Sequence, residues 1–231
     1  MADVLTVDHL QKKFGKFQAL KDITFSIHPG EVFGFIGPMV PASRQPSGRC
    51  SAFCAQLLAG QPFLAKTRGR CGQHPQAHRY VPGDVNLWPN LSGGEVIDFL
   101  LRLNGQWHTA RTDELIKDFD LDVSKKARTY SKGNRQKVAL VAAFSSQADL
   151  YIFDEPTSGL DPLMEEVFQR EVLALKQTGK SVLLSSHILS EVERMCDRIA
   201  IIRQGEIIEV GSLARCVSLV AAQCTSRLSS H

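Results

Sequence analysis

Short apolar runs alternate along the chain with segments of helical periodicity. Continuous β-rich runs at 32–37, 150–153 and 181–184 predict strands that are buried on both faces. Residues 4–7 and 23–27 have the character of further strands, and 199–203 with 206–210 predict a hairpin. The runs are bounded by turn residues, so the strand ends are well defined in the sequence.

Helical periodicity occurs between these strands, at 94–103, 112–119, 135–144, 162–178 and 189–196. Asp161 is placed to cap the fourth of these helices, and Gly179 is placed to end it. The alternation of apolar strands with helices predicts an α/β fold with a largely parallel sheet.

The segment from Met39 to Arg79 breaks this pattern. A helix should follow the strand at 32–37, but the segment has four prolines and no sustained helical period. It also contains six basic residues and no acidic one, and a second acid-free stretch follows Glu209. Five of the six cysteines lie in these two stretches, namely Cys50, Cys54, Cys71, Cys216 and Cys224. We expect 39–79 and 215–231 to be aberrant segments of a single domain.

The composition limits the classes of function. A chain of 231 residues suits one globular unit, and no apolar run is long enough to span a bilayer. The start of the chain lacks the pattern of a signal peptide, so we expect a cytoplasmic protein that reaches a membrane only through a partner. Outside the two acid-free stretches acidic residues outnumber basic ones, so the net charge of +3 is no argument for a nucleic-acid partner.

Two carboxylates, Asp154 and Glu155, directly follow the apolar run 150–153. The carboxyl ends of parallel strands carry the sites of α/β folds, and such a pair suits Mg²⁺ and water chemistry. A structural Asp-Glu-Pro turn is the alternative. The full stretch Asp154-Glu155-Pro156-Thr157-Ser158-Gly159-Leu160-Asp161, however, resembles the Walker B motif and D-loop of ABC ATPases.

Two further features agree with this resemblance. Tyr130-Ser131-Lys132-Gly133-Asn134-Arg135-Gln136-Lys137 is similar to the variant signature motif of export-type members, with Ser131, Gly133 and Gln136 as the nucleotide contacts that the resemblance implies. His187 matches the switch histidine that contacts the γ-phosphate. Leu91-Ser92-Gly93-Gly94-Glu95 also looks like a signature, but it lies too early, so Ser92 is predicted to cap the next helix instead.

The N-terminal part adds two expected nucleotide contacts, Phe14 and Gly37. Phe14 matches the aromatic residue that stacks on adenine, although a core role is the alternative. Gly37 ends the strand from which a phosphate-binding loop should start. The expected Walker A pattern, Gly-x-x-x-x-Gly-Lys-Ser/Thr, is absent after it, and Gly83-Asp84 stands where the Q-loop glutamine belongs.

The genetic code offers an explanation for the missing loop. Codons built from the third base of each codon and the first two bases of the next can encode Gly-Ala-Gly-Lys-Ser-Thr-Thr-Ile across 39–47. This is the missing phosphate loop, so we hypothesise that 39–79 is translated out of frame and that the frame returns by Tyr80. A zinc site is the alternative, with Cys50, Cys54, Cys71, His74 and His78 as ligands.

The resemblance implies a P-loop NTPase (RecA-like) core at 1–90 and 145–214, with a helical ABC subdomain at 91–144. It further implies ATP and Mg²⁺ as cofactors, Glu155 as general base, His187 as γ-phosphate sensor and Asp154 as the Mg²⁺ residue, with Asp161 in the D-loop. A transmembrane permease subunit and a second ABC ATPase subunit are the implied partners. The expected function is an export ATPase subunit with a defective Walker A site; the alternatives are a non-catalytic partner in a heterodimer and a non-transport ABC protein.

Overall fold

The computed structural model describes residues 3–14, 17–37, 78–203 and 205–212. The sequence-predicted aberrant segments therefore lie outside the described residues, apart from His78 and Arg79. Within them the chain order is β1 (Leu5–Phe14), β2 (Phe17–Ile27), β3 (Val32–Ile36), β4 (His78–Val81), α2 (Gly93–Leu103), α3 (Ala110–Asp118), the 3₁₀ turn η1 (Ala127–Thr129), α4 (Lys132–Phe144), β5 (Leu150–Asp154), α5 (Pro162–Gln177), β6 (Ser181–Ser186), α6 (Leu189–Met195), β7 (Arg198–Arg203) and β8 (Glu206–Ser212).

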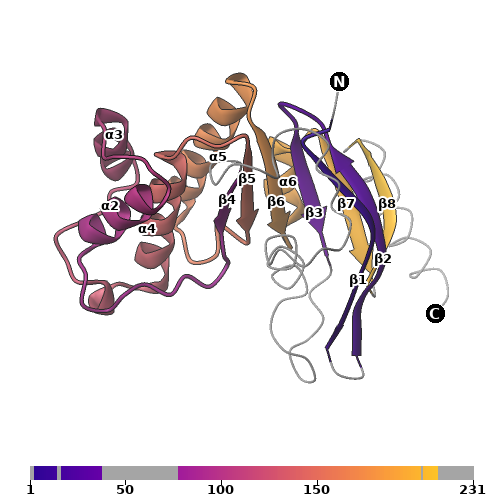
Figure 1. Cartoon of the computed structure of the whole chain (residues 1–231), viewed down its shortest axis with the longest axis horizontal. Coiled ribbons are helices and arrows are strands. Elements are labelled where there is room, and N and C mark those ends of the chain that lie inside the picture. Colours follow the sequence, from indigo (N-terminus) through magenta and orange to yellow (C-terminus); the bar gives the residue numbers. More distant parts are fainter. Residues whose placement is uncertain (1–2, 15–16, 38–77, 204, 213–231) are drawn as a thin grey trace.

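One sheet of eight strands runs through the described part of the chain, in the order β1-β2-β8-β7-β3-β6-β5-β4. Five of the seven described strand pairs are parallel, which confirms the α/β prediction. The β1–β2 and β7–β8 pairs are antiparallel hairpins, so the sheet is mixed. Figure 1 shows β1, β2 and β8 at one end of the sheet and β4 and β5 at the other.

The central strands are buried as the continuous apolar runs predicted. Every residue of β5 and β6 is buried. One face of these strands packs against the helices, and the other face shares a hydrophobic cluster with residues of β1 and β2. On β3, Gly34 permits a close helix contact, since a Cβ at this position would lie 2.6 Å from Val192 Cγ1 on α6. A side chain there would push α6 away from the sheet.

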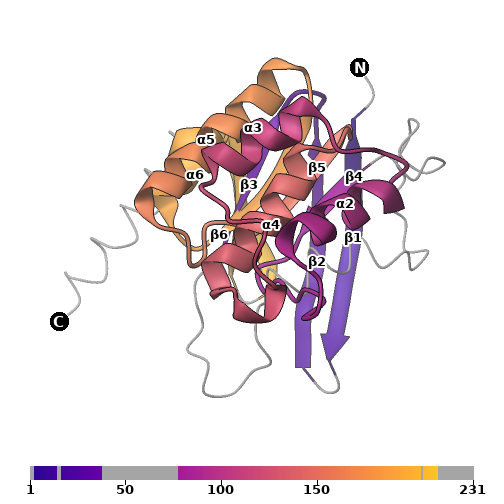
Figure 2. The ribbon, with the colours of Figure 1, turned by 90° about the vertical axis from the view of Figure 1, so that its left-hand side faces the viewer.

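Helices α2, α3 and α4 gather beside the β4–β5 end of the sheet (Figures 1 and 2). The predicted cap at Ser92 is confirmed: its side chain accepts from the Glu95 backbone N–H, and the Glu95 carboxylate accepts from the Ser92 N–H. Asp161 caps α5 as predicted, by accepting from the Met164 N–H at 3.1 Å. The division into a core and a helical subdomain at 91–144 stays a prediction.

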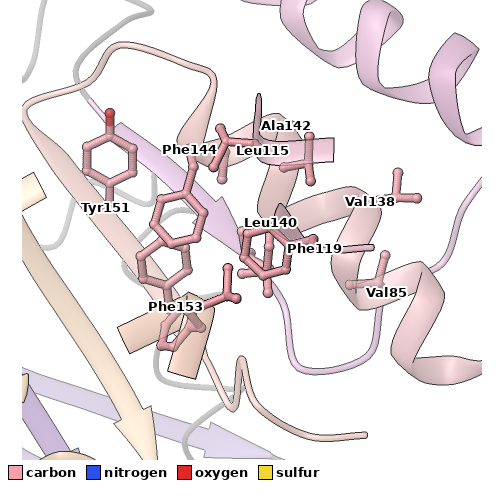
Figure 3. Close-up of a cluster of buried hydrophobic side chains, with 14 of the residues drawn as sticks. Val85, Leu115, Phe119, Val138, Leu140, Ala142, Phe144, Tyr151 and Phe153 are labelled. Atoms are coloured by element: carbon pink, nitrogen blue, oxygen red, sulfur yellow. The ribbon is translucent and has the colours of Figure 1, made fainter. Parts of the chain in front are cut away.

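Aromatic packing joins these helices to the sheet (Figure 3). Phe153 of β5 lies at the centre, with ring centroids 5.2 Å from Phe144 of α4 and 5.3 Å from Phe168 of α5. Phe119 stacks on Phe144 from the α3 side. The strand that ends in Asp154 is therefore fixed in position by the main hydrophobic core. Among the described residues, no helix combines the length and the apolar character needed to cross a membrane.

Strand β4 begins earlier than the sequence predicted. Regular structure was expected to return at Tyr80, but β4 begins at His78 and pairs with β5 through His78–Leu150 and Arg79–Tyr151. Regular structure therefore returns two residues earlier than expected, while the boundary of the aberrant segment at Arg79 stays a prediction. Strand pairing does not need an apolar side chain at every position. The polar residues His78 and Arg79 at the start of β4 therefore gave no sign of a strand in the sequence.

A salt-bridged histidine links α2 to the start of α3. His108 Nδ1 lies 2.7 Å from Asp98 Oδ1 on α2, and Nε2 lies 3.1 Å from Asp113 Oδ1 on α3. The hydrogen bond to Asp98 is the main cause of a raised His108 pKa, against partial burial, which lowers it. Stabilisation by this charge is complete below the usual histidine pKa and is lost as the pH rises through the raised value.

We expect His108→Gln to lower the free energy of unfolding by about 0.5 kcal/mol near pH 5.5, a small value because solvent screens the exposed pair. The loss should shrink toward zero near pH 9, where the imidazole of the unaltered chain is neutral. Urea unfolding at the two pH values measures both numbers. An equal loss at both would show that His108 contributes by packing and not by its charge.

Candidate nucleotide site

Three strand ends meet at one edge of the sheet, and each carries a predicted site residue or leads into one. In the parallel register Asp154 at the end of β5 lies opposite Ser185 of β6, and Ser186 lies opposite Ile36 of β3. Gly37, Glu155 and His187 directly follow these three strands. The structure therefore brings Gly37, Asp154, Glu155 and His187 to the same edge, which is where open parallel sheets bind ligands.

Glu155 and His187 contact each other directly. His187 Nδ1 lies 2.6 Å from Glu155 Oε2, and the two side chains are 35% and 28% exposed. Both groups are thus accessible from the same side. Glu155 also has a positive φ of +47°, which is uncommon for a residue with a Cβ. Strain of this kind persists only where the surroundings hold it, and it concentrates at functional sites.

The Glu155 carboxyl has a raised pKa. Burial is the main cause, and the charges of Asp154 and Glu191 add to it, while His187 opposes it. A carboxylate whose pKa is moved toward neutrality is a better proton acceptor than an ordinary glutamate. The geometry and the raised pKa together make Glu155 suitable for taking a proton from a water molecule.

Ser185 connects the two carboxylate residues and was not among the predicted site residues. Its buried hydroxyl donates to Asp154 Oδ1 at 2.5 Å. The backbone N–H of Glu155 donates to Ser185 Oγ at 3.1 Å and to the Ser185 carbonyl oxygen at 3.1 Å. Ser185 therefore holds the strained Glu155 backbone in place. Two consecutive small hydroxyl residues before His187, at the end of a buried strand, were the available signal.

Asp154 is fully buried at the strand end. Mg²⁺ is usually held by one or two carboxylates together with water and the phosphates of the substrate. One oriented carboxylate beside Glu155 fits that donor set. No group of three or more His, Cys, Asp or Glu residues in the described part could hold a metal alone. Of the alternative zinc ligands only His78 is described.

The predicted signature motif forms the start of α4. Ser131 is the N-cap, with its hydroxyl accepting from the Asn134 N–H at 3.2 Å. A Cβ at Gly133 would lie 2.3 Å from the Gly159 carbonyl oxygen, so the D-loop packs against this end of the helix. Lys132 strengthens the contact by donating to Ser158 Oγ at 2.7 Å. The signature and the D-loop of one chain are therefore in direct contact.

The remaining predicted site residues lie apart from the Glu155–His187 contact or cannot be placed. Gln136 is fully buried in α4, and neither of its amide atoms has a hydrogen-bond partner among the described residues. Asp161 is engaged as the α5 cap. Phe14 is the last residue of β1, and its side chain lies outside what the structure describes.

A methyl group at Gly133 should separate the signature from the D-loop. We expect Gly133→Ala to lower the free energy of unfolding by about 1–3 kcal/mol, because the new Cβ meets rigid backbone. Gly94→Ala on α2 is the matched control, since its Cβ would lie at an ordinary 3.6 Å from Val123. That variant should be neutral or slightly stabilising. Equal losses in urea unfolding would contradict the contact.

Comparison with known proteins gives the family. The family model described as "ABC transporter" matches residues 56–158. An uncharacterised ABC transporter ATP-binding protein, YhaQ of Bacillus subtilis, is 30% identical over 222 residues, which cover 91% of this chain and 72% of YhaQ. From the same organism, the linearmycin resistance ATP-binding protein LnrL is 31% identical, with 90% and 69% covered. The ABC transporter ATP-binding protein NatA is also 31% identical, with 88% and 85% covered.

A solved structure agrees with these relatives. The chain is similar to one titled "Structure of ATP binding subunit of ABC transporter", with a TM-score of 0.75 and 27% identity over 94% of this chain and 93% of the other. The strand order, the site edge and the relatives lead to the same assignment. The chain belongs to the family of ABC transporter ATP-binding proteins.

Proposed function

We propose that this chain is the ATP-binding subunit of an export-type ABC transporter whose own phosphate loop is defective in the present sequence. The observation that carries the proposal is the meeting of Asp154, Glu155 and His187 at the edge where Gly37 ends β3. These groups have complementary roles only around a bound nucleoside triphosphate and its Mg²⁺. ATP and Mg²⁺ are therefore the proposed ligands.

Each residue has a distinct proposed role. Glu155 accepts the proton of the attacking water, because its carboxyl is accessible and its pKa is raised. Asp154 would hold Mg²⁺, which neutralises phosphate charge during phosphoryl transfer. His187 contacts the γ-phosphate by donating a ring N–H. In the nucleotide-free chain the Glu155–His187 contact occupies both groups, so we expect ATP to separate them.

The missing element of the site is the phosphate cradle. No Lys and no Gly-rich loop follow Gly37, so nothing there neutralises the β- and γ-phosphates. The family model matches only from residue 56 onward; it takes in residues 56–79 but not the stretch after Gly37. The hypothesis that the coding sequence after codon 38 is read out of frame rests on the hidden Gly-Ala-Gly-Lys-Ser-Thr reading across 39–47.

The proposal also includes the direction of transport and the partner subunits. The name of the relative LnrL refers to linearmycin resistance, which supports export over import. ABC ATP-binding proteins work with transmembrane permease subunits, and we propose such a partner, with the chain on the cytoplasmic face of the membrane. A second ABC ATPase subunit completes the proposed assembly, in which ATP lies between Asp154 and Glu155 of one subunit and Ser131 and Gly133 of the other. The nucleotide would also contact Phe14 and Gly37, with Asp161 nearby in the D-loop. The expected contact from Gln136 is not proposed, because this side chain is fully buried in α4.

A non-catalytic role in a heterodimer is the second candidate. It is favoured by the signature end of α4, where Ser131 caps the helix and Gly133 packs on the D-loop although the phosphate loop is missing. Such a chain would lend its signature to the intact site of its partner. It would contribute to hydrolysis without binding ATP through its own strands.

A complementation experiment tests this role. A chain with the reading frame restored and Ser131→Asp has a phosphate loop, and the new carboxylate keeps the cap of α4 but repels the phosphates of ATP, so its own dimers should not hydrolyse ATP. Adding the unaltered chain should restore steady-state phosphate release, up to about half the rate of repaired dimers, because one of two sites becomes complete.

The control is the unaltered chain carrying Ser131→Asp, which should restore nothing. Equal restoration by both chains would overturn the signature role. No restoration by the unaltered chain, in a mixture shown by light scattering to contain dimers, would exclude the heterodimer role and leave a chain defective on both sides.

A further inference from the structure

A buried polar cluster lies directly behind the Glu155–His187 contact and has no part in the roles described so far. Glu191 of α6 is 6% exposed, and one of its carboxylate oxygens accepts two hydroxyl hydrogen bonds. Thr157 Oγ1 donates to Glu191 Oε2 at 3.0 Å, and Ser186 Oγ donates to the same oxygen at 2.8 Å. All three side chains are buried.

The two hydroxyl residues flank the site residues in the sequence. Thr157 stands two residues after Glu155, in the turn closed by the Ser158 N–H to Glu155 carbonyl bond of 3.1 Å. Ser186 immediately precedes His187, and its hydroxyl also accepts from the Ile188 N–H at 3.0 Å. The Glu191 carboxylate therefore links the turn after β5, which carries Glu155, to the segment after β6, which carries His187.

A carboxylate is a costly choice for this position. Burying a charge is unfavourable unless hydrogen bonds compensate it, and an apolar side chain of similar size would fill the same space without that cost. Glu191 also increases the negative potential at Glu155, so it does not stabilise the ionised form of that residue. A single Glu191 oxygen that accepts from both hydroxyls does, however, fix the distance between Thr157 and Ser186.

We propose that Glu191 is a positioning residue that sets the contact between Glu155 and His187 by fixing Thr157 and Ser186 relative to each other. The functional meaning of that contact rests on the proposed function. The positioning itself concerns only the nucleotide-free chain. Without Glu191, the turn after Glu155 and the residue before His187 lose their common anchor, and the 2.6 Å contact opens.

The imidazole of His187 reports this contact directly. Because Glu155 accepts a hydrogen bond at Nδ1, the neutral ring is held with its proton on Nδ1. Nitrogen-15 NMR of the full-length, nucleotide-free chain distinguishes this tautomer from the one protonated at Nε2, and His187→Asn assigns the signals. We expect Glu191→Leu to remove the Nδ1–H signature of His187. Glu191→Gln keeps a side-chain oxygen that can accept from both hydroxyls, so it should retain the signature.

Glu193→Leu is the matched control, because Glu193 lies exposed on the same helix, and it should leave the His187 spectrum unchanged. An unchanged His187 tautomer in folded Glu191→Leu would overturn the proposal, as would loss of the signature in Glu191→Gln. Thr157→Val tests the same link if Glu191→Leu fails to fold: it removes one donor, and an unchanged His187 spectrum would again overturn the proposal. None of these results depends on ATP binding, so failure of the proposed function would be seen separately.

Discussion

Restoring the reading frame between codon 39 and Tyr80 is expected to strengthen Mg·ATP binding relative to the present chain. The strands that carry Asp154, Glu155 and His187 are already in register with β3, which ends beside them at Gly37. A phosphate loop at that point would add backbone N–H groups and a lysine facing the β- and γ-phosphates. Charged hydrogen bonds of this kind contribute about 1.5–3 kcal/mol each, so two of them imply an affinity gain of at least about 100-fold.

The experiment compares the two chains by Mg·ATP titration, with one base inserted near codon 39 and the compensating change before Tyr80 removed. A third chain, repaired but with the restored lysine codon encoding alanine, separates the effect of the loop from that of improved folding. Equal affinities in the unaltered and repaired chains would contradict the hypothesis. A repaired chain that folds without binding ATP would mean that the hidden Gly-Ala-Gly-Lys-Ser-Thr reading is a coincidence.

The sequence predicted the elements that carry the site because their signals are local. The continuous apolar run 150–153 became β5, and Asp154 at its end faces the site edge as expected. The cap at Ser92 was predicted from its place before a helical period. The structure adds the reciprocal bond with Glu95, which explains why the signature-like stretch at 91–95 is structural. Helix ends and buried strands are decided by neighbouring residues, so one sequence suffices to find them.

Other features depend on contacts between distant segments and could not be read from the sequence. The place of the antiparallel β1–β2 pair beside β8, at one end of the sheet, depends on topology. The positive φ of Glu155 and its support by Ser185 exist only because β6 lies beside β5. The direct contact of Glu155 with His187 spans 32 positions of the chain, and motif matching alone assigned the two residues separate roles.

The structure also gives a physical reason for one departure from the family pattern. Gly83 stands near the place of the expected Q-loop glutamine, and a Cβ there would lie 3.0 Å from the Asp154 carbonyl oxygen and 3.2 Å from Glu155 Cβ. Any side chain at this position would press on the strained residue that the proposed mechanism uses as base. The glycine therefore allows the loop after β4 to approach the site closely, at the cost of the usual glutamine contact.

Glu155→Gln in the repaired chain is expected to abolish turnover while retaining Mg·ATP binding. Glutamine keeps the size of the side chain and can accept the hydrogen bond from His187, but it cannot take a proton from water. General-base catalysis typically contributes about 10²–10⁴-fold, so phosphate release should fall by about that factor.

Because the loss lies in the chemical step, ATP should accumulate bound between two subunits and favour the dimer, which size-exclusion chromatography measures. Glu193→Gln, an exposed glutamate of α6, is the control and should leave turnover unchanged. If Glu155→Gln lost ATP affinity and turnover in parallel, Glu155 would be a binding group and the assignment of the base would be wrong.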